Sequence, residues 1–197
     1  DAEVALTFAG TTQENKITIA QWSKEGLLLN QLQMSGVDQQ EPYSQVWLSS
    51  NGQLAAKPGK NYTIDLIRPT GQLYTTLSGH TEKITSISFS SQQKLVASGS
   101  KDKTVRLWNY ADNTSEILQG HQDSLTSISF SPQDELLATS SEDRTVKIWH
   151  TSGQLLSNLE TSEPVLELSW VGDRQTQNYW LLAKTRSGKL LQWAVKG

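Results

Sequence analysis

Short stretches of alternating hydrophobic and polar residues run along most of this 197-residue chain. Residues 84–90 (ITSISFS) show the pattern clearly, because successive side chains of an extended segment point to opposite sides. Residues 95–100, 104–109 and 116–119 follow as further segments of the same kind, separated by short polar turns. Long stretches with the 3.6-residue spacing of a helix do not occur in the sequence. The pattern therefore predicts consecutive β-strands and an all-β fold.

The four-strand pattern recurs 41 residues further on. Residues 79–108 (GHTEKITSISFSSQQKLVASGSKDKTVRLW) and 120–149 (GHQDSLTSISFSPQDELLATSSEDRTVKIW) match at every landmark. A fixed period near forty with strand-like patterning is typical of modular β architectures. Less regular copies flank the two repeats, with strands expected at 3–9, 16–22, 26–32, 43–50, 54–59, 62–69, 73–79, 165–171, 179–185 and 189–196.

Together these segments predict one domain over residues 1–197, built from five units with 18 strands. The first unit lacks its first strand and the last lacks its fourth. We therefore expect a fragment of a larger assembly, with open sheet edges through which copies of the chain self-associate. The expected units are 1–34, 43–78, 84–119, 125–159 and 165–197.

Composition excludes several classes of protein. The chain has no Cys, which rules out disulfides and thiolate zinc sites and fits a reducing compartment, so we expect a cytoplasmic location. Its 17 basic and 20 acidic residues are scattered singly, without the basic stripe of a nucleic-acid-binding surface. Apolar runs fall far short of the roughly 20 residues of a membrane-spanning helix. We expect neither a nucleic-acid nor a membrane partner.

The sequence also offers little for catalysis or for a cofactor. Phosphate-binding glycine loops and the HExxH zinc motif are missing. Carboxylate pairs such as Asp134-Glu135 fall in predicted turns, where such side chains are solvated or bond the backbone. The three histidines lie in separate segments without metal-ligand spacing, and His150 is expected at an exposed strand end. We therefore expect no metal, no cofactor and no enzymatic activity.

Ten residues of the two repeats resemble the WD-repeat β-propeller family: Gly79-His80, Ser98, Asp102 and Trp108, and likewise Gly120-His121, Thr139, Asp143 and Trp149. The resemblance implies four-stranded sheets packed radially around a channel, each burying the face of its neighbour. The other units match by strand pattern and position. They depart from the motif with Gln39, Asn61, Ile67, Thr161 and Ser187, and they keep Trp22 and Trp193.

In this family the His, Ser or Thr, Asp and Trp positions form a buried structural network of hydrogen bonds. The resemblance assigns that role to His80, Asp102 and Trp108 with a serine hydroxyl, from Ser98 or Ser100, of which Ser98 is favoured because its equivalent is Thr139. The second network comprises His121, Thr139, Asp143 and Trp149. The alternative is a hydrolase triad with Ser98 as nucleophile, His80 as base and Asp102 as the orienting acid. A hydroxyl engaged by a Trp inside a sheet leaves no access for a substrate, which favours the structural role.

The family's peptide-binding positions lie at the narrow rim of the channel. Carried over by position, they are Ser44, Lys60, Thr85, Lys101, Thr126, Glu142 and Arg186. Their mixed polar and charged character suits a protein or peptide partner. The sequence thus predicts a non-catalytic interaction scaffold or sensing platform, part of a larger signalling or regulatory protein. The alternatives are a purely structural assembly element and an enzyme that uses the channel mouth.

Overall fold

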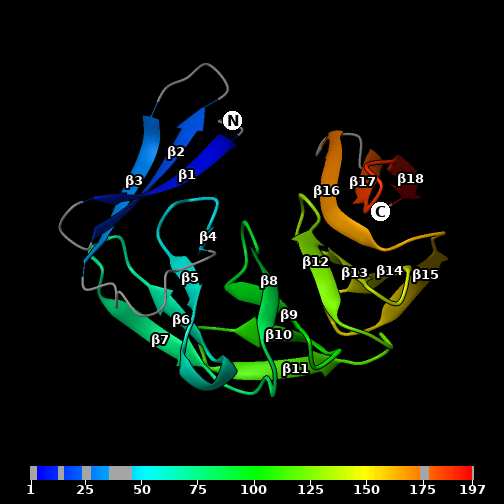
Figure 1. Ribbon diagram of the computed structural model, residues 1–197, viewed down its shortest axis with the longest axis horizontal. Helices are drawn as coiled ribbons and strands as arrows, with labels where there is room; N and C mark the ends of the chain where they lie inside the picture. Colours follow the sequence, from blue (N-terminus) through cyan, green and yellow to red (C-terminus); the bar gives the residue numbers. More distant parts are fainter. Residues whose placement is uncertain (1–3, 13–15, 24–27, 36–45, 174–177, 197) are drawn as a thin grey trace. The chain divides into compact units, whose positions relative to one another are not determined.

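The computed structural model describes residues 4–12, 16–23, 28–35, 46–173 and 178–196, and almost all of its regular structure is β-strand (Figure 1). The strands are β1 (Val4–Thr12), β2 (Lys16–Ser23), β3 (Leu28–Ser35), β4 (Trp47–Leu48), β5 (Ala55–Pro58), β6 (Ile64–Ile67), β7 (Leu73–Leu77), β8 (Ile84–Phe89), β9 (Leu95–Ser100), β10 (Val105–Asn109), β11 (Thr114–Leu118), β12 (Leu125–Phe130), β13 (Leu136–Ser141), β14 (Thr145–His150), β15 (Leu155–Glu160), β16 (Val165–Asp173), β17 (Asn178–Thr185) and β18 (Leu190–Lys196). A single 3₁₀ turn, η1 (Lys60–Tyr62), lies between β5 and β6 in the described part of the chain.

These strands form five antiparallel sheets in chain order: β1–β3, β4–β7, β8–β11, β12–β15 and β16–β18. The three- and four-stranded grouping confirms the all-β prediction with incomplete first and last units. Most strands differ from their expected bounds at one or both ends, β4 and β11 among them. β4 covers only Trp47–Leu48, because the Ser49 N–H bonds the Leu54 carbonyl at 2.9 Å and begins the turn into β5. β11 begins at Thr114 rather than at residue 116, because Thr114 already pairs with Asn109.

Contacts between residues divide the chain into two compact units, residues 1–78 and 79–197. The single domain over residues 1–197 stays a prediction. Within each unit the sheets are simple meanders in which consecutive strands pair. At the free edge of the last sheet, β18 pairs with β17 alone among the described residues. This is one of the open edges at which the sequence predicts self-association.

Strand register supports the expected place of the first sheet's strands in the repeat. In the fourth sheet, Trp149 of the third strand pairs with Leu155, and one residue of β15 bulges out beside this pair. The same irregularity occurs at Ile67 in the second sheet and at Trp22 in the first. β2 and β3 therefore have the register of third and fourth strands, and β1 has that of a second strand.

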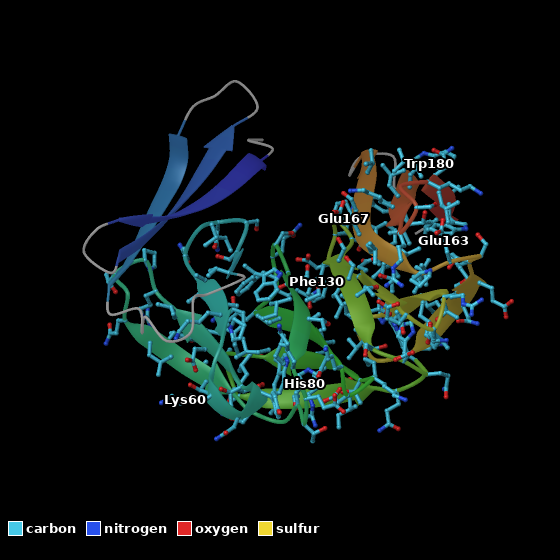
Figure 2. All side chains as sticks on the ribbon, viewed as in Figure 1. Lys60, His80, Phe130, Glu163, Glu167 and Trp180 are labelled. Carbon is cyan, nitrogen blue, oxygen red and sulfur yellow. The ribbon has the colours of Figure 1, made fainter. Side chains whose placement is uncertain are left out.

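In the unit of residues 79–197, the first strands of successive sheets lie side by side: β8 beside β12, and β12 beside β16 (Figure 1). Side chains alternate between the two faces of each sheet, and the fourth sheet, which lies between the third and the fifth, buries both of its faces. In β13, Leu137 packs toward the third sheet, whereas Leu136 and Ala138 pack toward the fifth. Phe130 of β12 belongs to the first of these clusters (Figure 2).

Serine side chains join the first strands to one another. The Ile128 N–H donates to Ser86 Oγ at 3.2 Å, and the equivalent Leu168 N–H donates to Ser127 Oγ at 3.1 Å. These bonds satisfy backbone donors that a neighbouring sheet would otherwise leave without a partner. The alternation of Ser with Ile in β8 and β12 therefore sets the spacing between sheets.

Gly99 allows the fourth sheet to approach the third closely. A Cβ atom at Gly99 would lie 2.7 Å from Leu125 Cβ, which is too short for any real contact. The matched positions in the next pair of sheets hold Ser140 and the smaller Val165. We expect Gly99→Ser to lower the free energy of unfolding by about 1–3 kcal/mol through overpacking.

A double variant provides the control for this effect. Adding Leu125→Val to Gly99→Ser copies the natural Ser140–Val165 pair and should recover part of the loss. Urea denaturation of the wild type, both single variants and the double variant measures the coupling. Strictly additive losses would contradict the steric explanation.

Candidate functional site

The sequence-predicted residues of the third sheet meet in a continuous chain of hydrogen bonds. Trp108 Nε1 donates to Ser98 Oγ at 2.7 Å, and Ser98 Oγ lies 2.8 Å from His80 Nε2. His80 Nδ1 in turn lies 2.7 Å from Asp102 Oδ2. Ser100 takes no part, since its hydroxyl donates to the Glu82 carbonyl. The donors assign one neutral tautomer, in which Nδ1 carries the hydrogen and Nε2 accepts from the hydroxyl.

The fourth sheet repeats this arrangement with Thr in place of Ser. Trp149 Nε1 donates to Thr139 Oγ1 at 2.9 Å, and the distances to His121 Nε2 and from His121 Nδ1 to Asp143 Oδ2 are also 2.9 Å. Sequence reasoning missed one member of each network. Thr145 donates to Asp143 Oδ1 at 2.7 Å, as Thr104 does to Asp102. The recurrence of Thr two residues after the Asp in both repeats was the available signal.

Burial controls the titration of the two histidines. It lowers the pKa of His80 and of His121 below 6.5, although the hydrogen-bonded aspartate beside each ring raises it in part. For Asp102 and Asp143 burial raises the pKa, but hydrogen bonds from backbone N–H groups, threonine hydroxyls and the imidazoles outweigh it, and the net pKa lies below 3.8. Each network therefore holds a neutral imidazole against a carboxylate at neutral pH.

This geometry does not serve nucleophilic catalysis. Ser98 and Thr139 are fully buried, and each hydroxyl already accepts an indole N–H and lies against an imidazole nitrogen. A nucleophile needs a substrate carbonyl beside it and donors for the oxyanion. The networks instead satisfy polar groups inside the sheets and hold the strands in register.

Three of the predicted rim residues occupy equivalent positions at one end of the sheets. Each backbone N–H donates to the carbonyl of the residue immediately before the first strand of the same sheet. The pairs are Lys101 with Lys83, Glu142 with Ser124, and Arg186 with Pro164. Arg186 Nη2 also contacts Glu142 Oε1 at 2.5 Å, so the fourth and fifth sheets are linked at the rim. Lys101 is exposed and has no ion-pair partner within the described ranges.

The remaining rim residues contribute less to an open surface. Thr85 Oγ1 donates to the Gly99 carbonyl, and Thr126 Oγ1 donates to the Val165 carbonyl, so both hydroxyls are engaged inside the protein. Lys60 is exposed in η1 and belongs to the other compact unit. Ser44 lies outside the described residues. The structure thus groups Lys101, Glu142 and Arg186 within the unit of residues 79–197.

Comparison with known proteins identifies the repeats. The family model described as "WD domain, G-beta repeat" matches residues 71–109 and 113–150, the segments that carry the two networks. The matched part of the chain therefore consists of two WD40 repeats. Domains of this family generally act as protein-interaction scaffolds and are typically non-catalytic.

The solved structure titled "Crystal structure of RRP9 WD40 repeats" matches with a TM-score of 0.66 at 18% sequence identity. The match covers 77% of this chain and 50% of that chain, so the chain spans about half the length of this structural neighbour. At this identity the likeness shows the fold alone, that of part of a WD40 propeller. No curated protein sequence matches the chain.

The fifth sheet has a different hydrogen-bond network in place of the His–Ser/Thr–Asp–Trp network. Glu163 accepts hydrogen bonds from the hydroxyls of Thr185 and Ser187, at 2.7 Å and 2.5 Å. These bonds, with the Ser187 N–H, lower the pKa of Glu163 below its usual 4.5. The carboxylate comes from the loop before β16 (Figure 2) rather than from the turn after β17, where the repeats carry Asp. Sequence reasoning found Ser187 in the Asp position but not this substitute.

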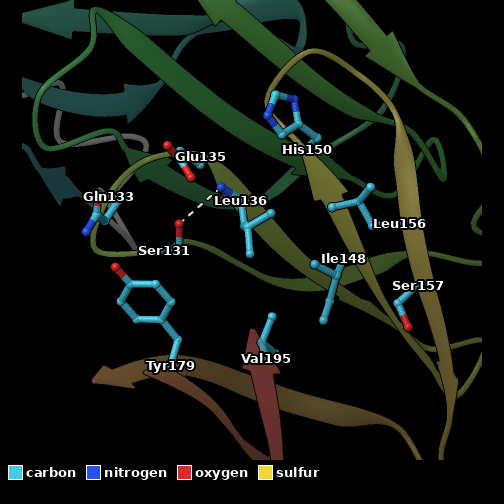
Figure 3. Close-up of a pocket in the computed structure, with 10 residues that line it drawn as sticks. All are labelled: Ser131, Gln133, Glu135, Leu136, Ile148, His150, Leu156, Ser157, Tyr179 and Val195. Atoms are coloured by element: carbon cyan, nitrogen blue, oxygen red, sulfur yellow. Dashed lines mark hydrogen bonds between the residues drawn. The ribbon is translucent and has the colours of Figure 1, made fainter. Parts of the chain in front are cut away.

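A cavity of about 280 Å³ lies between the fourth and fifth sheets of the WD40 unit (Figure 3). Its walls combine apolar side chains with Tyr179, whose buried hydroxyl has no hydrogen-bond partner within the described residues. The lining residues are Ser131, Gln133, Glu135, Leu136, Ile148, His150, Leu156, Ser157, Tyr179 and Val195. His150, expected at an exposed strand end, is exposed at the end of β14 and bonds Ser152.

The described residues contain no cluster of His, Asp and Glu that could hold a metal ion. Nor does any helix among them have the length and apolar character needed to cross a membrane.

Proposed function

We propose that this WD40 unit is a non-catalytic scaffold that binds a peptide segment of a partner protein at the rim marked by Lys101, Glu142 and Arg186. The observation that carries the proposal is their equivalence: three successive sheets place a charged residue at the same end through the same backbone hydrogen bond. Two cations and one carboxylate at such positions favour a partner that carries both charges. Rim charges of this kind influence the rate and specificity of association more than its affinity.

Two other functions receive less support. A purely structural role leaves the exposed charge at Lys101 without a purpose. An enzyme would need an acid, base or nucleophile with access to substrate, and the Ser, His and Asp of the networks are engaged with one another inside the sheets.

The test uses peptides selected against the wild-type chain from a displayed random library. Binding of the selected peptides is then measured to the triple variant Lys101→Ala, Glu142→Ala, Arg186→Ala. We expect at least a tenfold weaker affinity, which corresponds to about 1.4 kcal/mol. The control is Lys94→Ala with Glu116→Ala, which removes one cation and one anion from exposed positions away from the rim. Equal binding by the wild type and the triple variant would show that the rim is not the docking surface.

A further inference from the structure

The outer face of the fifth sheet, meaning the face turned away from the fourth sheet, is exposed and largely apolar. Side chains of β16–β18 alternate, and those that pack toward the fourth sheet include Val165, Leu168, Leu181 and Ala183. The others point outward. Val171 is 50% exposed, Trp180 43% and Leu190 76%, and no strand within the described ranges covers them. Trp180 and Glu167 mark this sheet in Figure 2.

Strand pairing arranges this outer face in three rows. Val171, Trp180 and Ala194 pair directly across the three strands and form an apolar row. Leu182 lies in the next row, between Ser169 and Gln192. Glu167 and Lys184 form the third row with Leu190, and Lys184 Nζ lies 3.5 Å from Glu167 Oε1. The outer face therefore has an apolar row centred on Trp180 and, two rows away, one positive and one negative charge.

Register shows that this face differs from the corresponding face of the two preceding sheets. The Glu167–Lys184 pair occupies the rung that is Ser86–Gly99 in the third sheet and Ser127–Ser140 in the fourth. At that rung both preceding sheets hold small residues in the second strand, and a serine of the first strand accepts a backbone N–H from the next sheet. Gly99 has no room even for a methyl group. A long charged pair at the same rung does not fit sheet stacking of that kind.

We propose that the outer face of the fifth sheet binds a second copy of this chain through a two-fold symmetric contact. A two-fold axis that runs parallel to the strands, between β16 and β17, makes Val171 of each copy face Trp180 of the other and buries the two apolar rows against each other. It also lets Glu167 of each copy meet Lys184 of the other, so one self-complementary surface supplies both attractive pairs. We expect the two copies to associate reversibly, so the fraction of dimer rises with chain concentration.

Charge reversal tests this contact by sedimentation velocity over a range of chain concentrations. The wild type is expected to shift from 21.9 kDa toward twice that mass as concentration rises. Glu167→Lys alone and Lys184→Glu alone should each weaken the dimer at least tenfold, because each brings like charges together. Trp180→Glu should abolish it. Ile117→Glu, at an exposed position on β11, is the control and should retain the dimer.

Mixing the two charge-reversed variants gives the decisive readout. One copy then presents two cations and the other two carboxylates, so a mixture of Glu167→Lys with Lys184→Glu should regain the dimer that each variant has lost. Melting temperatures of the single variants establish that they are folded. A monomer at every concentration would overturn the proposal. So would a dimer that is indifferent to all the charge changes, which would instead indicate pairing through the free edge of β18. The triple rim variant should still dimerise, so this proposal and the proposed function fail independently.

Discussion

Thr139→Val is expected to lower the free energy of unfolding by about 3 kcal/mol. The substitution keeps the shape of the side chain but removes the hydroxyl that joins Trp149 to His121. Both partners are buried, so the indole N–H and the imidazole nitrogen are left without hydrogen bonds. Each orphaned buried group costs about 1–3 kcal/mol. Urea denaturation at neutral pH measures the loss.

The two repeats supply the control for this experiment. Thr139→Ser introduces the residue that the third sheet uses naturally at Ser98, keeps the hydroxyl and removes one methyl group. We expect it to cost about 1 kcal/mol. If Thr139→Val were as stable as Thr139→Ser, the network would not contribute to the fold.

The same logic separates the structural role from a hydrolase. In a hydrolase, Ser98→Ala abolishes an activity and leaves the stability unchanged. In this protein we expect Ser98→Ala to destabilise the third sheet, since Trp108 and His80 lose their common partner.

Strands and networks could be predicted from sequence where the chain repeats itself. The 41-residue repeat identifies equivalent positions in the two units. The alternation of hydrophobic and polar residues then indicates which side of a strand each position occupies. In the third sheet β8 ends one residue before the expected limit, and β9 has the expected bounds. The contacts of His80, Ser98, Asp102 and Trp108 are local to one sheet, so a repeat motif is sufficient to anticipate them.

Interactions between sheets could not be predicted in the same way. Arg186 contacts Glu142 across 44 positions, and Thr126 bonds a carbonyl of the following sheet. Such contacts depend on how closely two sheets approach, which single-repeat patterns do not encode. Glu163 is a further case: its role appears only when the loop before β16 is placed beside Thr185 and Ser187.

Stability is expected to fall as the pH is lowered below about 6.5, because the two network histidines are harder to protonate in the folded chain. Burial lowers the pKa of His80 and His121 below the value of 6.5 found in an unfolded chain. Between the folded and unfolded values, the unfolded chain binds more protons, so acid favours unfolding. The slope cannot exceed about 1.4 kcal/mol per pH unit for each histidine.

Protonation also reverses one bond of the hydrogen-bond chain. A protonated His80 Nε2 is a donor, so Ser98 Oγ would accept from both His80 and Trp108, and its own O–H would lose the ring as its acceptor. Asp102 and Asp143 act at lower pH. Their pKa lies below 3.8 in the folded chain, so their contribution is present above that value and is lost as the pH falls below it.

Urea denaturation between pH 7.5 and 5.0 would measure the histidine effect, with the slope against pH as the readout. His121→Asn removes one of the two groups and should reduce the slope by about half, whatever its effect on stability at neutral pH. His150→Gln replaces the only histidine outside the networks and leaves both intact, so we expect it to keep the wild-type slope. Stability that is flat or rising between pH 6.5 and 5.0 would show that the folded chain accepts protons on His80 and His121 as readily as the unfolded chain does. The neutral imidazole would then not be the form that holds Ser98 and Thr139 in place.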